Sequence, residues 1–238
     1  MNNPYQTIIQ RKEVWRKKRI IREIYLQWFS LIRRYLVQGT TVELGAGIGI
    51  GKDFIEKCIE TDIVFLPWLD TVLDAHSLPF KAQSISNIIG IDVLHHLRRP
   101  ALFFLESERV LREGGRLILL EPYVSPLSYM IYRIFHNEAI CLRDDPLREE
   151  GVKIIDNQAV SNLIFFRYQK QFKVKFPKLK IIVKRIQDLF IYPLSGGFKG
   201  ISFLCPPMLR HLKRIEDILH PLRRILGFRV FIVLERCM

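Results

Sequence analysis

A turn rich in glycine, which begins at Glu43, is the feature of this sequence that most clearly suggests ligand binding. It reads Glu43-x-Gly45-x-Gly47-x-Gly49, with Ala46 between the first two glycines. Glycine lacks a Cβ atom, so a backbone that is rich in glycine can approach a ligand closely. Such a turn at the carboxyl end of a strand is typical of nucleotide-binding sites. We therefore predict that these five residues contact a cofactor.

Four further motifs follow the turn in order. They are Asp62, nineteen positions after Glu43; Asp74-Ala75-His76-Ser77-Leu78-Pro79-Phe80; Ile91-Asp92-Val93-Leu94-His95-His96-Leu97; and Leu111-Arg112-Glu113-Gly114-Gly115-Arg116-Leu117, with Glu121-Pro122 after it. The dinucleotide fingerprint is Gly-x-Gly-x-x-Gly, whose third glycine is placed for a pyrophosphate. The spacing here is Gly-x-Gly-x-Gly, which argues against a dinucleotide.

The five motifs, spread over residues 42–122, resemble those of the class I S-adenosylmethionine-dependent methyltransferases, and in particular the methyltransferase type 11 group. The resemblance implies S-adenosylmethionine as cofactor, a ligand without phosphate. It implies that Asp62 accepts hydrogen bonds from both ribose hydroxyls, as one carboxylate can. It also implies that Asp74 accepts one from the adenine amino group, that the Ala75 N–H reaches the adenine ring, and that the loop at Asp92 lines the methionine end.

Each motif also has a purely structural explanation. Glu43 could hydrogen-bond only to backbone groups near the turn, and Asp74 could close a turn of its own. Gly114-Gly115 is a common helix terminator. The five motifs in order favour a cofactor site over these separate explanations.

Catalytic residues are less clearly marked. Methyl transfer from a sulfonium is an in-line displacement, so alignment and the exclusion of water supply much of the acceleration and a base is optional. If the acceptor is a hydroxyl, His95 or His96 could take its proton. Glu121 and Tyr123, at the end of a predicted strand, are further candidates. Their structural alternatives are a histidine packed in the loop, a loop carboxylate and an aromatic rim.

These residues require a sheet with parallel strands. Alternating strands and helices predict a Rossmann-like, doubly wound α/β fold, with a mostly parallel seven-stranded sheet, an antiparallel last strand, an amino-terminal helix and a helical insertion or lid after strand five. The predicted strands are 40–44, 62–65, 86–93, 116–121, 178–186 and 228–235, and the predicted helices include 8–37, 52–58 and 100–111.

The predicted organisation is one domain with an extension. It consists of a basic amphipathic helix (1–40) and a methyltransferase domain (41–238), divided into a cofactor-binding half (41–122), an insertion or lid (123–177) and carboxy-terminal strands with a lid loop at Pro193–Phe198 (178–238). Docking of the amino-terminal helix on the domain is favoured over a position on a membrane surface.

The connection from Asp62 to Asp74 is too short for the family pattern. Only eleven residues separate them, whereas a parallel connection generally needs a dozen or more. We therefore expect the second crossover helix to be missing and residues 65–69 to form a tight apolar loop. The amino-terminal helix, or Trp68, would then cover the exposed sheet, and the adenine pocket would be atypical.

The charge of the chain is uneven. The total is +13, from +7 over residues 1–40, −4 over 41–125 and +10 over 126–238. Basic flanks attract anionic partners, which include phospholipid head groups, nucleic acid and phosphorylated substrates. The sign of the charge does not choose among them.

The remaining composition indicates the compartment. The four cysteines form no Cys-x-x-Cys pair and no secretion signal is visible, so we expect a cytoplasmic protein, with peripheral contact at the inner face of the membrane as an option. His136-Asn137-Glu138 offers two ligands without further partners, so no metal site is predicted.

The resulting hypothesis is methyl transfer to a small, apolar or lipid-like acceptor. One alternative is RNA or tRNA methylation, which the charge favours, although the chain lacks an Asn/Asp-Pro-Pro-Tyr motif and a dedicated RNA module. Another is a partner protein that binds the cofactor without catalysis. The sequence leaves the oligomeric state open.

Overall fold

A computed structural model of the chain describes residues 3–135, 139–153 and 155–238. The strands are β1 (Thr41–Leu44), β2 (Cys58–Asp62), β3 (Thr71–Val72), β4 (Ile85–Ile91), β5 (Leu111–Pro122), β6 (Leu179–Gln187) and β7 (Arg229–Arg236). The α-helices are α1 (Pro4–Lys17), α2 (Arg19–Arg33), α3 (Pro100–Val110), α4 (Pro126–Phe135), α5 (Val160–Asn162), α6 (Gln169–Lys175), α7 (Ile191–Leu194), α8 (Leu209–Ile218) and α9 (Arg223–Leu226). Short 3₁₀ turns and a π-helical turn, Leu163–Arg167, join them.

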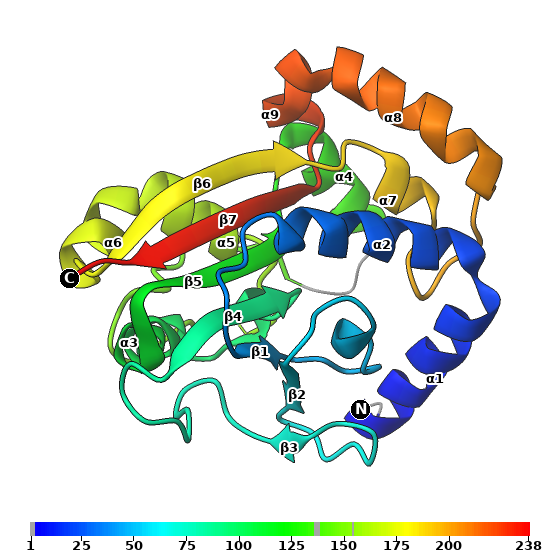
Figure 1. Cartoon of the computed structure of the whole chain (residues 1–238). Coiled ribbons are helices and arrows are strands. Elements are labelled where there is room, and N and C mark those ends of the chain that lie inside the picture. Colours follow the sequence, from blue (N-terminus) through cyan, green and yellow to red (C-terminus); the bar gives the residue numbers. More distant parts are fainter. Residues whose placement is uncertain (1–2, 136–138, 154) are drawn as a thin grey trace.

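The seven strands form one twisted sheet in the order β3-β2-β1-β4-β5-β7-β6 (Figure 1). Strands β1 to β5 are parallel, and β7 is antiparallel to both of its neighbours. This is the Rossmann-like sheet that the sequence predicts, including the antiparallel last strand. The carboxyl ends of β1, β2, β4, β5 and β6 therefore meet at one edge, where ligands of such sheets bind. The connection 188–228 leaves and re-enters the sheet at this same edge, because β6 and β7 are antiparallel.

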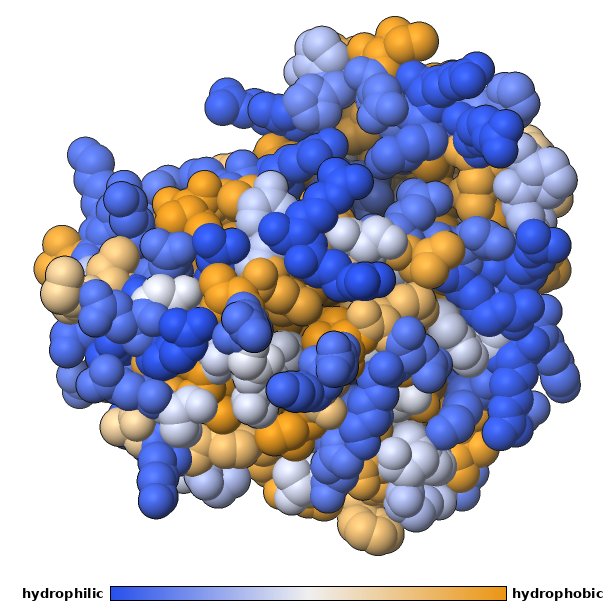
Figure 2. All heavy atoms as spheres, in the orientation of Figure 1, coloured by the Kyte–Doolittle hydropathy of each residue, from blue (hydrophilic) through white to orange (hydrophobic). Residues whose placement is uncertain are grey.

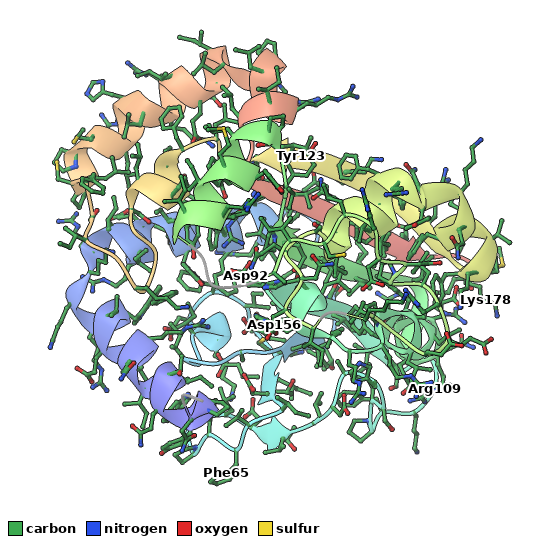
Figure 3. The ribbon with its side chains drawn as sticks, turned by 180° about the vertical axis from the view of Figure 1, so that it is seen from behind. Phe65, Asp92, Arg109, Tyr123, Asp156 and Lys178 are labelled. Carbon is green, nitrogen blue, oxygen red and sulfur yellow. The ribbon has the colours of Figure 1, made fainter. Side chains whose placement is uncertain are left out.

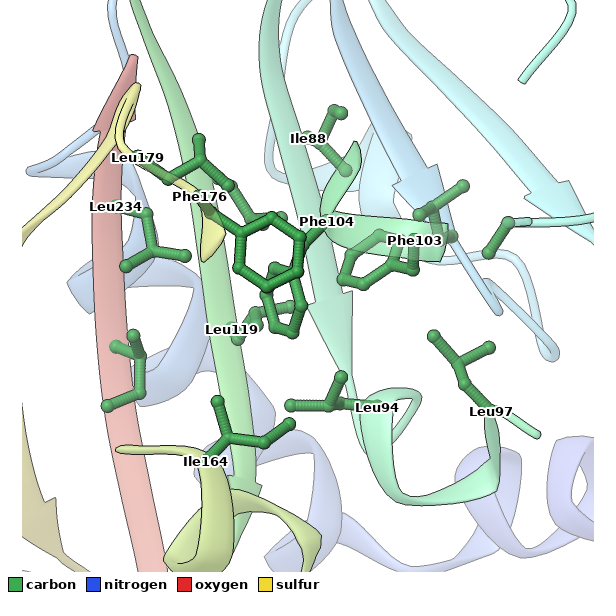
Figure 4. Packing of buried hydrophobic residues seen from close by; sticks show 14 of the residues in the cluster. Ile88, Leu94, Leu97, Phe103, Phe104, Leu119, Ile164, Phe176, Leu179 and Leu234 are labelled. Atoms are coloured by element: carbon green, nitrogen blue, oxygen red, sulfur yellow. The ribbon is translucent and has the colours of Figure 1, made fainter. Parts of the chain in front are cut away.

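Each face of the sheet is buried under a separate apolar cluster. On one face, Phe103 and Phe104 of α3 pack with Leu119 and with phenylalanines of the insertion, including Phe172 and Phe176 (Figure 4). On the other face, Ile89, Ile118, Leu120 and Phe231 contact α2. Neighbouring residues of one strand face opposite clusters, as the two-residue period of a strand requires.

The predicted amino-terminal helix is two helices. The chain breaks at Lys18, whose dihedral angles are φ −101° and ψ 89°, between α1 and α2. The apolar stripe of α2 is buried, with Ile21, Phe29 and Ile32 almost fully covered, so this stripe docks on the sheet as the favoured interpretation expects. None of the residues of α1 is buried.

Helices are missing from the first part of the sheet. The helix expected over 52–58 is wrong, because only a 3₁₀ turn, Gly51–Asp53, lies between β1 and β2. The second strand consequently spans Cys58–Asp62 and not 62–65. Thirteen residues, four of them glycine, leave too little chain for a helix. No helix lies between β2 and β4, in a fully described stretch, as expected.

Helix α2 replaces the missing first crossover helix. The ring of Phe29 stacks on Phe54, which directly follows the 3₁₀ turn, with centroids 4.6 Å apart. A segment that precedes β1 in the sequence thus covers the face that a crossover helix would otherwise protect. The division of the chain into the four predicted segments stays a prediction.

Candidate active site

The glycine turn takes the left-handed backbone that its sequence allows. Gly45, Gly47 and Gly49 have φ values of +63°, +50° and +68°, a region that other residues adopt only at a cost. The turn is fastened to β2, because the Ala46 N–H donates to the Thr61 carbonyl (2.8 Å) and the Gly47 N–H donates to Asp62 Oδ2 (3.0 Å).

One of the three glycines faces open space. A Cβ atom on Gly45 would lie 2.7 Å from Val93 Cγ2, and one on Gly49 would lie 2.7 Å from Trp68 Cδ1. A Cβ atom on Gly47 would meet only the Gly45 carbonyl oxygen, at 3.8 Å. Gly45 and Gly49 are therefore required by packing within the protein. Gly47 is the position at which a ligand can approach the backbone.

Asp62 lies beside this opening. One carboxylate oxygen accepts from the Gly47 N–H and the other from the Val64 N–H, each at 3.0 Å. A carboxylate has about four acceptor sites, so acceptor capacity remains for two hydroxyls. Ile63 and Phe65, which follow Asp62, are 65% and 71% exposed and add an apolar surface that sequence reasoning did not assign to the site.

Trp68 closes one side of the turn. Its Nε1–H donates to the Gly47 carbonyl (2.9 Å), and its ring lies under Lys12 Nζ of α1, 3.8 Å from the ring centroid. The short second crossover therefore places an indole against the glycine turn. The expected atypical adenine pocket stays a prediction.

Glu43 lies beneath the turn. Its side chain is buried next to Gly51, whose lack of a Cβ atom makes room for Oε2, and this oxygen has no hydrogen-bond partner among the described residues. Burial, with the neighbouring Glu60, raises the pKa of Glu43 to about 8. Glu43 is therefore largely neutral at pH 7 and packs inside the protein. Its contact with a cofactor stays a prediction.

Asp74 closes a local turn, which is the structural alternative for this residue. It accepts from the His76 N–H (2.9 Å) and from His76 Nδ1 (2.6 Å), and His76 Nε2 accepts from the Arg99 N–H. Partial burial raises the pKa of Asp74, but these hydrogen bonds outweigh it and hold the pKa below its usual value. The side chain is half exposed, and Ala75 beside it is buried in the core. The predicted adenine contacts of both residues stay predictions.

Glu121 organises the loop after β4. Its Oε1 accepts from the Val93 and Leu94 N–H groups, both at 2.8 Å, and its Oε2 lies 2.8 Å from His95 Nδ1. Both Glu121 and His95 are buried. Among the described contacts, the carboxylate is used to hold the loop in place, which matches its structural alternative.

His96 and Tyr123 lie in different surroundings. The His96 ring packs on His95, with centroids 4.0 Å apart, and its Nδ1 is 2.7 Å from Asp156 Oδ1 in the insertion. Its side chain is 42% exposed. Tyr123 is buried against Phe166, and burial raises its pKa. Of the four candidate catalytic residues, His96 is therefore the one that solvent reaches most.

Asp92 forms a partly buried ion pair that sequence reasoning missed, in which Arg229 is buried and the Asp92 side chain is 28% exposed. Its φ is +57°, and its carboxylate accepts from both terminal nitrogens of Arg229, at 2.6 and 2.8 Å. The guanidinium lies 4.3 Å from the ring centroids of both Trp28 and Tyr192. Burial opposes the charge on Asp92, but Arg229 outweighs it and lowers the pKa of Asp92. A basic residue at the start of the last strand was the available signal, because that strand starts at the edge where β4 ends.

The structure thus brings several of the predicted site residues to one edge of the sheet. The glycine turn, Asp62 and Asp92 gather there, and Figure 3 shows Asp92 and Asp156 near the centre of the view, with Phe65 at the rim. Within the described ranges, no group of three or more His, Cys, Asp or Glu residues could hold a metal ion. His136, Asn137 and Glu138 lie outside the described residues. None of the described helices has the length and apolar character needed to cross a membrane.

Comparisons with known proteins show similarity of sequence and of fold. Residues 44–119 match the model of a family described as a methyltransferase domain. An uncharacterized 37.1 kDa protein in transposon TN4556 of Streptomyces fradiae is 43% identical over 58 residues, which cover 24% of this chain and 17% of that protein.

Solved structures share the fold at low sequence identity. A chain of the complex between the Haloferax volcanii Trm112 methyltransferase activator and a methyltransferase has a TM-score of 0.56 at 15% identity, over 98% of this chain and 95% of that one. Geranyl diphosphate C-methyltransferase from Streptomyces coelicolor A3(2) has a TM-score of 0.55 at 12% identity, over 91% and 80%. The PH0226 protein from Pyrococcus horikoshii has a TM-score of 0.54 at 13% identity, over 90% of each chain.

Proposed function

We infer, from the match of residues 44–119 to a methyltransferase domain, that this chain is a class I S-adenosylmethionine-dependent methyltransferase. We propose that it transfers a methyl group from S-adenosylmethionine to a small, apolar or lipid-like acceptor. We also propose a cytoplasmic location.

The observation that carries the cofactor assignment is the open face of Gly47 beside the Asp62 carboxylate. The turn leaves backbone accessible at one glycine only, and the adjacent carboxylate keeps free acceptor capacity. These features fit an adenosyl group, with Gly47 at the backbone contact and Asp62 at the ribose. When bound, S-adenosylmethionine supplies an electrophilic methyl group.

Aromatic packing near Asp92 supports an apolar acceptor. Tyr25 lies between Trp28 and Phe198, with ring centroids 4.7 and 5.7 Å away, and Trp28 also contacts Tyr192. Aromatic side chains that line a site favour apolar ligands and exclude water. The acceptor would therefore enter between α2 and the loop that follows α7.

The predicted lid loop, Pro193–Phe198, contributes Phe198 to these packed aromatic side chains, which we call the aromatic wall. Gly196 and Gly197 have left-handed φ values, and Lys18 Nζ donates to the carbonyls of Gly197 and Gly200, both at 2.8 Å. Lys18 is the residue at which α1 and α2 break apart. The loop and the helix break are thus joined, and we propose that they open and close together over the acceptor.

The residues of the chain would act mainly by positioning the acceptor and the methyl donor. Glu121 and His95 hold the loop at Asp92 in one conformation, and the aromatic wall excludes water from the acceptor, both of which favour an in-line displacement. His96, paired with Asp156, is the proposed proton acceptor if a hydroxyl is methylated.

Titration calorimetry with S-adenosylhomocysteine tests the cofactor site. We expect Gly47→Val and Asp62→Ala to weaken binding at least about tenfold, or about 1.4 kcal/mol, because one fills the opening and the other removes the ribose acceptor. Gly114→Val is the matched control, since Gly114 has a φ of +69° and no atom near its Cβ position. Equal binding by all variants would show that the pocket is elsewhere.

Two alternative functions predict different experimental results. Binding of S-adenosylhomocysteine without transfer of labelled methyl groups to any lipid or small-molecule extract would favour a non-catalytic partner protein. RNA methylation gains support from the basic flanks, and steeply salt-dependent RNA binding with methyl transfer to RNA would establish it.

A further inference from the structure

The segment from α8 to α9 stands at the same edge of the sheet as the candidate site. It belongs to the connection between β6 and β7, which leaves and returns at the carboxyl edge. Figure 1 shows α8 and α9 above the carboxyl end of β6 and the start of β7, beyond α4 and α7. Any surface that α8 presents therefore borders the proposed entrance for the acceptor.

The inner side of helix α8 carries a buried leucine and a buried carboxylate, and its outer side carries exposed isoleucines. Leu209 and Glu216 are buried, and Glu216 Oε1 accepts from three consecutive backbone N–H groups of residues 189–191 at 2.9 to 3.0 Å. Ile215 and Ile218 point outward instead, and Ile218 is 76% exposed. The inner side fixes the helix to the fold, so the outer side is presented in a fixed orientation.

The exposed apolar side chains continue past α8. Ile215, Ile218, Leu222 and Ile225 are all exposed, and steps of three, four and three residues separate them. We call these four residues the α8–α9 ridge. They lie on α8, on the 3₁₀ turn His220–Leu222 and on α9. A single exposed aliphatic residue is ordinary, but four of them within eleven residues mark a candidate binding surface. Figure 2 shows hydrophobic side chains at the top of the molecule, over α8, with hydrophilic ones beside them.

Cations surround the ridge. Arg210, Lys213, Arg214, Arg223 and Arg224 belong to the same segment, while Asp217 is its one exposed acidic residue because Glu216 is buried. A groove of about 720 Å³ between α2 and α8 is lined by Arg210, Lys213 and Arg214, and on the α2 side by Arg19, which is paired with Glu23. The surface therefore combines aliphatic side chains with a clear excess of positive charge.

We propose that the α8–α9 ridge docks on the surface of an anionic membrane, with its four aliphatic side chains among the acyl chains and its cations on the lipid head groups. Aliphatic residues beside arginine and lysine on one helix are typical of interfacial helices. The core of a protein interface, by contrast, is depleted of charge. The ridge replaces α2 in this role, because the apolar stripe of α2 is buried on the sheet. The inference builds on the proposed lipid-like acceptor, which would reach the site from the membrane.

Flotation with vesicles tests this surface. The full-length protein should float with vesicles of equal parts phosphatidylcholine and phosphatidylglycerol, should not float with phosphatidylcholine alone, and should be released by high salt. Ile218→Asp and the double variant Arg214→Glu/Arg224→Glu should each lower the bound fraction at least fivefold.

Helix α6 supplies the matched controls. Val174 is 82% exposed and Lys170 and Lys173 are exposed beside it, at the far end of the sheet in Figure 1. Val174→Asp and Lys170→Glu/Lys173→Glu should float like the wild type. Thermal melts of all variants confirm that each is folded.

Three outcomes would overturn the proposal. The first is a wild type that does not bind anionic vesicles, and the second is equal loss of binding in the α6 variants. The third is a dimer in ultracentrifugation that Ile218→Asp dissociates without vesicle binding, which would make the ridge an interface between copies of the chain. S-adenosylhomocysteine titration of the same variants separates the two proposals, because vesicle binding without cofactor binding would contradict the proposed function alone.

Discussion

At the scale of single residues, two carboxyl groups near the edge where ligands are expected have different surroundings. Asp92 and Arg229 neutralise each other, while Glu43 has no such partner. A buried carboxyl group without a cation favours its neutral form. The two acids therefore differ in charge at pH 7: Glu43 is buried and largely neutral, and the partly buried Asp92 is ionised beside Arg229.

The ion pair predicts a large loss of stability when one partner is removed. Arg229→Met leaves the partly buried Asp92 carboxylate uncompensated, and we expect it to lower the free energy of unfolding by about 1.5–3 kcal/mol, the range for hydrogen bonds to charged groups. The double variant Arg229→Met/Asp92→Asn should recover a substantial part of this loss. Urea unfolding of the wild type, both single variants and the double variant measures the coupling, and additive effects would mean that the pair is not formed.

Glu43 predicts a pH dependence. Its pKa of about 8 in the folded protein exceeds that of an unfolded chain, so the folded state binds more protons between these values and unfolding becomes easier as pH rises through this window. Its full effect is on the order of 5 kcal/mol, because the pKa rises from 4.5 to about 8. The unfolding free energy of Glu43→Gln should therefore fall less than that of the wild type between pH 5 and pH 8. Parallel curves would contradict the assignment.

At the scale of elements, α2 covers the face of the sheet that a crossover helix would otherwise cover. Two short connections leave one face of the sheet without local cover, and α2 supplies the missing apolar side chains from the amino-terminal side of β1. The glycine turn is thereby supported from below by Phe54 against Phe29. The first predicted helix of the chain is thus part of the domain's core.

The packing of helix α2 on the sheet can be tested with one substitution on its buried side and one on its exposed side. Phe29→Ala removes a fully buried ring and should cost about 3–5 kcal/mol in unfolding free energy. Leu26→Ala alters a side chain that is half exposed and should cost about 1 kcal/mol or less. Thermal and urea unfolding compare them. Similar losses in both would mean that the face of α2 that packs on the sheet is wrongly assigned.

At the scale of the whole molecule, the charge is arranged around the site. The acidic middle of the chain forms most of the sheet, and the basic flanks supply α1, α2, the insertion and the α8–α9 segment. Because the connection before β7 returns to the carboxyl edge, basic helices border that edge. The same arrangement supports both an anionic membrane and, in the alternative, RNA as the partner.

The sequence by itself determined the fold class, with its mostly parallel sheet and antiparallel last strand, and the position of the glycine turn after the first strand. These follow from local patterns, because glycine spacing and apolar alternation act on neighbouring residues. It misplaced the first crossover, where helix propensity suggested a helix over 52–58 that the short, glycine-rich connection could not complete.

Only the tertiary structure decided which residues meet across the sheet. Arg229 and Asp92 are 137 positions apart, and Trp28 and Asp188 are 160 apart, yet both pairs are in hydrogen-bond contact. Such pairs depend on which strands are neighbours and which helix covers each face. These are properties of the packed sheet that no local sequence pattern carries, because the energy of each contact exists only after distant segments have been brought together.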